Sequence, residues 1–373
     1  MNILILSWRG PGHPHAGGAE QATQEYAKGW VKAGHSITLF TSYYSGAKKE
    51  EIIDGVKIKR SGSQIFGVHI AAFKWFVFDK HEKFDIVIDQ FHGIPFFTPL
   101  YIREKKLAFI HEVTKEVWGL NPWPVPFNLM PAILGRVFEP FIFKFFYRNV
   151  PFMTGANSTK QDLTVWGIPQ ENITVIPYGV NLQRIKSFQK ENKKTLMFLG
   201  ALSKDKGIED ALEIFSKLNR LNADFQFWIV GKGEKYYLKK LKKQRDRLGL
   251  NERLKFWGFV NEEQKFKLLG LAHILVTPSA REGWGLVVIE AASVGTPTVG
   301  YNVAGLKDSI LDGKTGILCN PDPQSCAETV LELIKNSEKY ETLRKNCFEW
   351  SKKFNWEDSS KKSLNLIEKL VNI

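Results

Sequence analysis

The sequence predicts an α/β protein made of two doubly wound domains. Short apolar runs of strand length alternate with helical patterns along the chain, which is typical of parallel sheets built from βαβ units. The chain has 373 residues, more than a single hydrophobic core usually serves. The alternation also restarts at Thr195, after a polar, lysine-rich stretch at 181–194. We therefore expect two sheets, each covered by its own helices.

The expected strands are the apolar runs 3–6, 36–40, 86–88, 107–110, 152–155, 174–176, 195–198, 225–229, 254–256, 274–277 and 298–299. They predict a first domain at 1–180 and a second at 181–355, followed by a helix at 356–373 that has an apolar face to cover. In doubly wound sheets, ligands bind beyond the carboxyl ends of the strands. We therefore expect the two domains to face each other across a ligand-binding cleft.

Composition and charge narrow the function classes. The chain is 43% apolar and 24% charged, as in globular proteins, and its net charge of +13 favours anionic partners. No basic stripe interleaved with aromatic residues appears, so we expect no nucleic acid partner. The three cysteines are too scattered for a metal site and are expected to be reduced thiols. The apolar start is too short for a signal peptide, which predicts a cytoplasmic protein.

A glycine-rich loop follows the first expected strand. Gly10, Gly12, Gly17 and Gly18 lead through Ala19-Glu20 into a helical pattern. Glycines let the backbone approach a ligand, and a helix N-terminus offers free N–H groups to an anion. We expect Gly17 and Gly18 to contact a sugar or its phosphate, and the alternative is a tight first turn without a ligand.

A second loop carries carboxylates. The run Pro278-Ser279-Ala280-Arg281-Glu282-Gly283-Trp284-Gly285-Leu286 precedes a helical pattern that contains Glu290. With Glu282 in the loop and Glu290 one turn inside the helix, both carboxylates can accept hydrogen bonds from the hydroxyls of one ligand. The N–H groups of 284–287 would then point at a diphosphate. The alternative is a pair of ordinary surface glutamates.

The segment from Glu282 to Glu290 resembles the Glu-x7-Glu signature of the family 4 retaining glycosyltransferases, which have the GT-B fold of two Rossmann-like domains. Further segments agree with this family in its order: Gly17-Gly18-Ala19-Glu20, Gly34-His35, His111-Glu112, Asn157-Ser158-Thr159, Ile176-Pro177-Tyr178-Gly179-Val180-Asn181, Lys206-Gly207, Gly231-Lys232-Gly233, Gly258-Phe259-Val260, Gly295-Thr296-Pro297-Thr298 and Ala304-Gly305. The resemblance covers nearly the whole chain and is specific as a combination. It implies transfer of a hexose-like sugar from a nucleotide sugar with retention of anomeric configuration, without a further cofactor.

The resemblance also implies roles for single residues. Glu290 would bind the ribose and Glu282 the donor sugar, while Lys206 would bind the diphosphate together with Gly283, Trp284, Gly285 and Leu286. Gly17 and Gly18 would close over the sugar phosphate, and Val260 would lie near the base. His111, after the strand at 107–110, would contact the transferred sugar, although a lone histidine there could equally be structural. The catalytic residues implied are thus His111, Glu282 and Lys206, and the helix at 356–373 would pack back on the first domain.

One departure from the family pattern concerns the diphosphate. Where the family usually has Gly-Arg-Leu, this chain has Gly200-Ala201-Leu202, so a basic ligand is missing. The loss of a charge-assisted hydrogen bond costs about 1.5–3 kcal/mol. Lys204 is the nearest candidate to replace it. A milder departure is Ala304-Gly305 in place of a double glycine.

Mechanism and alternatives follow from what the sequence contains. No residue is identified as a nucleophile for a double displacement. The family resemblance implies instead a same-face attack in which the leaving diphosphate helps to deprotonate the acceptor. No Asp-x-Asp metal motif appears, and cationic groups can replace a metal at the diphosphate, so we expect metal independence. The alternatives are another enzyme on the same fold, either a sugar-nucleotide epimerase or a pyridoxal-dependent phosphorylase, and a non-catalytic or nucleic-acid-binding protein on a degenerate scaffold.

The segment 118–152 is the most aromatic part of the chain and is too interrupted to span a bilayer. Its apolar residues are mixed with Arg136, Lys144 and Arg148, which is typical of interfacial attachment to anionic lipid. We therefore expect peripheral binding to the inner face of the membrane. Together with this attachment, the family resemblance implies a lipid-linked or cell-surface glycan precursor as acceptor. The alternative is a helix pair packed into the first domain.

Overall fold

The computed structural model describes residues 1–373 except 121–126, 128, 182–187, 222–224 and 373. The chain forms two compact units. The N-terminal unit consists of 1–118, 130–179 and 356–373, and the C-terminal unit consists of 119–129 and 180–355. Each unit contains one sheet, so the expected architecture of two α/β sheets is confirmed.

The sheet of the N-terminal unit has eight strands in the order β3-β4-β2-β1-β5-β6-β7-β8. Its strands are β1 (Asn2–Ser7), β2 (Ser36–Thr41), β3 (Glu50–Ile53), β4 (Val56–Arg60), β5 (Ile86–Phe91), β6 (Lys105–Ile110), β7 (Phe152–Thr154) and β8 (Ile173–Val175). All neighbours are parallel except the hairpin of β3 and β4. The strand order reverses between β1 and β5, where a doubly wound sheet opens for a ligand.

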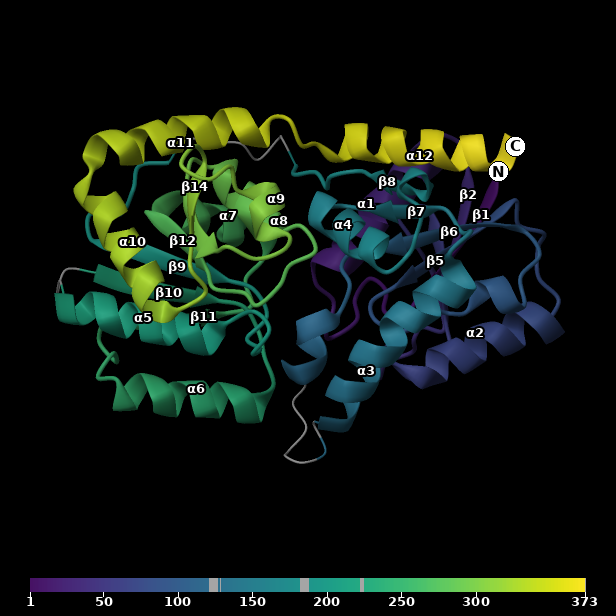
Figure 1. The fold of residues 1–373 in the computed structure, drawn as a ribbon, viewed down its shortest axis with the longest axis horizontal. Helices are drawn as coiled ribbons and strands as arrows, with labels where there is room; N and C mark the ends of the chain where they lie inside the picture. Colours follow the sequence, from purple (N-terminus) through teal and green to yellow (C-terminus); the bar gives the residue numbers. More distant parts are fainter. Residues whose placement is uncertain (121–126, 128, 182–187, 222–224, 373) are drawn as a thin grey trace. The chain divides into compact units, whose positions relative to one another are not determined.

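Helices cover both faces of this sheet (Figure 1). They are α1 (Gly18–Lys32), α2 (Phe66–Phe78), η1 (Thr98–Leu100), η2 (Lys115–Leu120), α3 (Leu129–Ile142), the π-helical turn η3 (Phe143–Tyr147), α4 (Asn157–Val165), η4 (Gln170–Asn172) and α12 (Trp356–Asn372). The C-terminal helix α12 packs on α1, where the Trp30 indole donates to Ser363 Oγ at 3.0 Å. A Cβ on Gly29 would lie 2.4 Å from Ser360, so the close approach of these helices requires the glycine.

The sheet of the C-terminal unit has six parallel strands in the order β11-β10-β9-β12-β13-β14. They are β9 (Lys194–Leu199), β10 (Phe225–Val230), β11 (Leu254–Gly258), β12 (Ile274–Thr277), β13 (Thr298–Tyr301) and β14 (Gly316–Cys319). Counted within this unit, the order is 3-2-1-4-5-6, that of a Rossmann sheet. The reversal lies between β9 and β12, so a ligand is expected beyond the carboxyl ends of these two strands.

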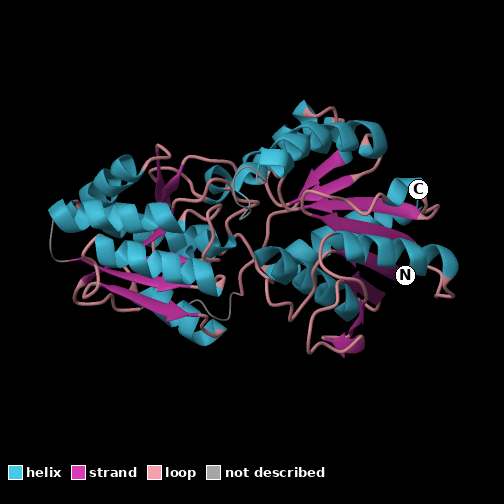
Figure 2. Cartoon of the chain, turned by 90° about the horizontal axis from the view of Figure 1, so that it is seen from below, coloured by secondary structure: helices cyan, strands magenta, loops and turns pink. Residues whose placement is uncertain are grey.

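The helices of this unit are α5 (Ile208–Leu221), α6 (Lys235–Arg247), α7 (Glu262–Leu271), α8 (Leu286–Ala292), α9 (Leu306–Ser309), α10 (Pro323–Lys335) and α11 (Ser337–Ser351). Figure 2 shows the strands between the helices. α5, α6 and α10 bury their apolar side chains against one face in a single core. α8 packs against α7 and α11. The three cysteines are free and buried.

Three strands were not expected from the sequence: β3, β4 and β14. β3 and β4 form a hairpin at the sheet edge, and the charged residues of β3 and the alternating lysines of β4 conceal the apolar pattern. β14 has only four residues and begins with Gly316, because a Cβ there would lie 2.4 Å from the carbonyl oxygen of Thr298. Edge position and short length therefore hide these strands from a search for apolar runs.

Candidate active site

Two loops meet at the strand reversal of the C-terminal unit. The loop at 200–207 follows β9, and the loop at 278–285 follows β12. Gly207 has a φ of 70°, and a Cβ on it would lie 1.8 Å from the carbonyl oxygen of Pro278. The N–H of Ala280 donates to the carbonyl of Asp205 at 2.8 Å. Only glycine permits this approach, which brings the side chains of both loops together.

The contact between the loops places Lys206 against Glu282. Lys206 Nζ lies 3.0 Å from Glu282 Oε2, and Ser279 Oγ donates to Glu282 Oε1 at 2.8 Å. The N–H of Glu282 donates to the carbonyl of Ala304 at 3.1 Å. Beside it, Gly305 has a φ of 81°, and a Cβ there would lie 2.0 Å from the Glu282 carbonyl oxygen. The second glycine of the family pattern is thus the one that the packing needs, and Ala304 is tolerated.

The carboxylate of Glu290 belongs to a second ion pair. Glu290 lies in the second turn of α8, whose N-cap Gly285 has a left-handed conformation with a φ of 78°. It is 5% exposed, and its Oε1 lies 2.6 Å from Lys265 Nζ on α7. Lys265 also lies 2.7 Å from Glu262. Burial alone would lower the pKa of Lys265, but the charges of Glu290 and Glu262 raise it, so the lysine stays protonated.

Sequence reasoning did not identify Lys265 or Ser279. Lys265 is 25 residues from Glu290 and Ser279 is three residues from Glu282. The pattern around Lys265 is that of an ordinary charged helix, with Glu262 three residues before it. Ser279 could have been found from the sequence, because a hydroxyl three residues before a candidate carboxylate can donate a hydrogen bond to it.

The other predicted donor residues of this unit lie at the carboxyl edge of the same sheet. Gly283, Trp284, Gly285 and Leu286 connect β12 to α8, and Val260 follows β11. Trp284 is buried and packs on the ring of Phe354 at 5.3 Å. Lys204 is exposed in the loop after β9, as is Ala201. Within the described residues, no cluster of three or more His, Cys, Asp or Glu side chains could hold a metal ion.

His111 lies at the carboxyl end of β6 in the N-terminal unit and is 5% exposed. Its Nδ1 contacts the Tyr178 hydroxyl, and its Nε2 lies 2.9 Å from the side-chain amide of Gln90. Burial, together with the positive charges of His92 and Arg9, lowers the pKa of His111 to about 3. The ring is therefore neutral, and the tautomer decides which of its two nitrogens donates and which accepts. Both ring nitrogens are thus used within the protein.

Gly17 and Gly18 form the N-cap and first residue of α1. The N–H of Gly17 donates to Glu20 Oε2 at 2.6 Å, and Glu20 Oε1 lies 2.9 Å from Arg9 Nε. We expected the N–H groups of this turn to face an anionic ligand, but the N–H of Gly17 already donates to the carboxylate of Glu20. Glu20 and Arg9 are the residues of this turn that sequence reasoning did not assign.

Comparison with known proteins identifies the family. Residues 180–350 match Glycosyl transferases group 1, and residues 16–184 match Glycosyltransferase Family 4. Glycogen synthase of Mycobacterium tuberculosis is 30% identical and covers 86% of this chain and 83% of its own length. The chain belongs to the family 4 glycosyltransferases. The predicted family and enzyme class are thereby confirmed.

Solved structures agree with this fold. Sucrose-phosphate synthase from Thermosynechococcus elongatus has a TM-score of 0.81 at 19% identity, over 99% of this chain and 98% of that chain. HepE of Anabaena, solved in complex with UDP-glucose, has a TM-score of 0.76 at 18% identity, over 99% and 100%. The predicted GT-B fold is confirmed. This family 4 glycosyltransferase is a retaining enzyme that uses a nucleotide sugar.

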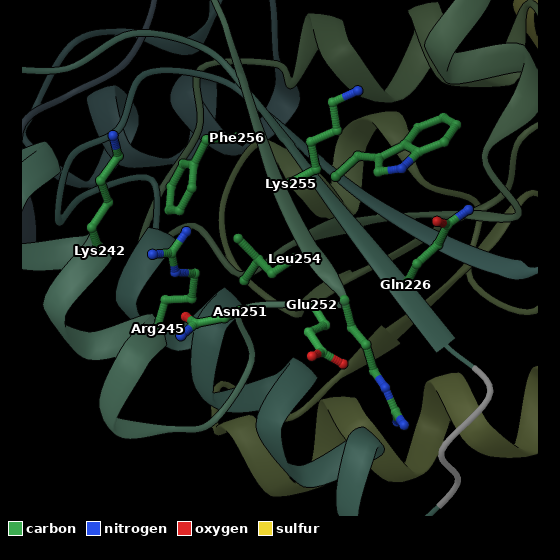
Figure 3. A pocket seen from close by; sticks show the side chains of 10 residues that line it. Gln226, Lys242, Arg245, Asn251, Glu252, Leu254, Lys255 and Phe256 are labelled. Carbon is green, nitrogen blue, oxygen red and sulfur yellow. The ribbon is translucent and has the colours of Figure 1, made fainter.

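One pocket of the glycosyltransferase lies away from these residues (Figure 3). It has a volume of about 470 Å³ and follows the outer edge of the C-terminal sheet between β11 and α6. Its lining residues are Gln226, Trp228, Lys242, Arg245, Asn251, Glu252, Arg253, Leu254, Lys255 and Phe256. None of the predicted donor residues lines it, and it is a broad, open hollow rather than an enclosed one, so we do not place the reaction there.

Proposed function

We propose that the loops after β9 and β12 hold the nucleotide sugar, with Lys206 on the diphosphate, Glu282 on the transferred sugar and Glu290 on the ribose. The observation that carries this proposal is the Lys206–Glu282 pair at the carboxyl edge of the strand reversal, 3.0 Å apart. A cation and a carboxylate at this distance match a donor in which an anionic diphosphate adjoins a polyhydroxylated sugar. When such a donor binds, the ion pair between Lys206 and Glu282 is replaced by a contact of Lys206 with the diphosphate and a contact of Glu282 with the sugar.

The proposed reaction takes place on one face of the sugar. The bond between the anomeric carbon and the diphosphate oxygen breaks, the acceptor hydroxyl oxygen bonds to that carbon, and its proton passes to the leaving diphosphate. Lys206 stabilises the negative charge that develops on the diphosphate. Electrostatic stabilisation of this kind is the largest single contribution to the rate enhancement of many enzymes. This fixed cation supports metal independence. We place His111 as a positioning residue of the N-terminal unit, because both its ring nitrogens bind protein groups.

The acceptor we propose is a lipid-linked or cell-surface glycan precursor. The net charge of +13 supports an anionic surface as the working environment. Among the described residues, no helix is both long and apolar enough to cross a membrane. The attachment we propose is peripheral, and we argue it below from the helices of the N-terminal unit.

A thermal-shift screen of the purified enzyme tests the proposed donor site. UDP, GDP, UDP-glucose and GDP-mannose are compared, because a ligand that binds the folded state raises its melting temperature by mass action. We expect a rise with one nucleoside diphosphate and its sugar derivative, and the same rise without added metal. No stabilisation by any nucleotide, or stabilisation only with a divalent cation, contradicts the proposal.

A first prediction concerns Lys265. Lys265→Met should raise the Kd for UDP about tenfold or more with a smaller effect on kcat, because the buried Glu290 loses the partner that holds its carboxylate. Lys265→Arg should retain most of the affinity. Glu262→Gln is the matched control, since it removes only the exposed partner of the same lysine. An equal effect of Glu262→Gln and Lys265→Met on UDP binding, measured by calorimetry, would contradict the role of Lys265.

A second prediction concerns the missing arginine. Ala201 is exposed in the loop that carries Lys206, so a longer side chain fits without repacking. Ala201→Arg should tighten UDP binding by about 10- to 100-fold, the range of one added charge-assisted hydrogen bond. Unchanged affinity would mean that another cation already serves the diphosphate, and Lys204→Ala would then have to weaken binding.

A further inference from the structure

α2 and α3 belong to one helical layer on the same face of the N-terminal sheet. α2 buries Val68, Ala72 and Trp75 against β1, β2 and β5. The turn η3, which continues α3, buries Phe143 and Tyr147 against β5, β6 and β7. Figure 1 shows α2 and α3 on one side of this sheet and α12 on the other. The outer sides of α2 and α3 therefore form one face of the unit.

η1 joins the two helices. The ring of Phe73 on α2 packs on Tyr101 at 5.1 Å, and the ring of Phe97 packs on Phe146 of η3 at 6.1 Å. Leu100, at the end of η1, is exposed between these contacts. The layer is thus continuous from α2 to α3.

The outer side of this layer is apolar to an unusual extent. Phe66 is 65% exposed, Phe78 is 73% exposed and Phe145 is 62% exposed. The exposed large apolar side chains are Ile65, Phe66, Ile70, Phe73, Val77 and Phe78 of α2 and its N-cap, Leu100, and Leu129, Met130, Ile133, Leu134, Val137, Phe138, Phe141 and Phe145 of α3 and η3. Single exposed apolar residues are ordinary, but a contiguous group of this size marks an interaction surface.

Basic side chains are placed among these apolar ones. Lys74 of α2, Arg136 of α3 and Lys144 of η3 are all exposed. The acidic residue of α3, Glu139, points inward instead: it is 2% exposed and accepts hydrogen bonds from the Thr114 N–H and the Trp118 indole. The helix thus presents cations and apolar groups outward and buries its carboxylate. This combination fits the boundary between anionic headgroups and acyl chains.

We propose that the outer face of α2, η1 and α3 docks on an anionic lipid bilayer, with both helices lying in the interface. α2, which lies outside the segment that sequence reasoning connected with a membrane, supplies part of this surface. A second copy of the chain fits less well, because a two-fold pair would enclose the exposed basic side chains of both copies in one interface, while Glu139, the acidic residue of α3, points inward. The proposal is independent of the donor site.

Vesicle co-sedimentation tests the proposal with the full chain. Vesicles of phosphatidylcholine alone are compared with vesicles that also contain phosphatidylglycerol, at about 0.05 M and about 0.5 M NaCl. We expect binding to the phosphatidylglycerol vesicles that weakens at high salt. The absence of binding to these vesicles at low salt overturns the proposal.

Two double variants separate the helices. Phe66→Ser with Phe78→Ser on α2, and Phe141→Ser with Phe145→Ser on α3 and η3, should each reduce vesicle binding by about tenfold or more. The control is Ile52→Ser with Val165→Ser, which removes apolar groups that are 70% and 80% exposed on other elements of the same unit. All three variants should keep the melting temperature and UDP affinity of the wild type, so a failure of the donor site remains distinguishable.

Two results contradict the two-helix surface. Loss of vesicle binding in the α3 variant only would confine the contact to α3. A wild-type dimer that dissociates in the α2 and α3 variants, seen by light scattering and without binding to vesicles, would assign the face to a second copy of the chain.

Discussion

Lys206→Ala should lower kcat/KM by about 10²- to 10³-fold, the effect of removing one preorganised group that stabilises a developing negative charge. In a site with two cations on the diphosphate, the second cation would partly compensate for the loss of a lysine. Here Ala201 stands where the family usually has that second cation, so the loss of activity should be larger. Lys206 has Glu282 as a partner at 3.0 Å, and Asp205 lies 3.9 Å away. The measurement is steady-state transfer, or hydrolysis of the donor where no acceptor has been found.

Lys204→Ala is the matched control for Lys206→Ala, since it removes a lysine that is exposed in the same loop. It should change kcat/KM only slightly if Lys206 acts alone. Comparable losses in both variants would mean that the two lysines share the diphosphate. A Lys206→Ala enzyme with near-normal turnover would contradict the assigned role.

Glu290→Ala and Glu282→Ala should fail in different ways. Glu290→Ala should weaken UDP binding by about 10- to 100-fold, because the ribose hydroxyls lose a charged acceptor. Glu282→Ala should leave UDP binding near normal, since UDP lacks the sugar that Glu282 contacts, and should depress kcat by a similar factor. Calorimetry with UDP and initial rates with the full donor separate these two effects.

Glu290→Gln and Glu282→Gln guard against a loss of fold in the alanine variants. Glu290 is buried against Lys265, so its truncation leaves a buried lysine short of a partner, whereas glutamine keeps the shape and one acceptor oxygen. Unfolding is monitored by the melting temperature of each variant. Equal loss of UDP affinity in the Glu282 and Glu290 variants would contradict the division between sugar and ribose.

Some elements could be predicted from the local sequence pattern, because neighbouring residues alone determine them. The strands of both sheet centres are apolar runs bounded by turns. At Gly207 and Gly305 a Cβ would lie 1.8 Å and 2.0 Å from a backbone oxygen, and Gly285 has a φ of 78°. The charged hairpin of β3 and β4 was missed, because an edge strand does not need two apolar faces. The position of the Glu282 loop followed from the strand and helix around it.

The segment 118–152 shows the limit of pattern alone. An apolar, aromatic stretch has the same composition whether it is packed in a core or lies on a surface. The structure leaves most of α3 exposed and buries Glu139, Phe143 and Tyr147 instead. α2 is apolar on all sides, which by itself predicts a buried helix, yet Phe66, Ile70 and Phe78 are exposed.

The sequence by itself determined the two α/β sheets, the family and the positions of Lys206, Glu282 and Glu290, because strand period, glycine spacing and loop motifs are properties of neighbouring residues. Only the tertiary structure decided which groups these side chains meet. Lys206 and Glu282 are 76 residues apart, Lys265 and Glu290 are 25 apart, and His111 reaches Tyr178 across 67. Contacts over such separations depend on how the strands are ordered in the sheet, and no local pattern along the chain encodes that order.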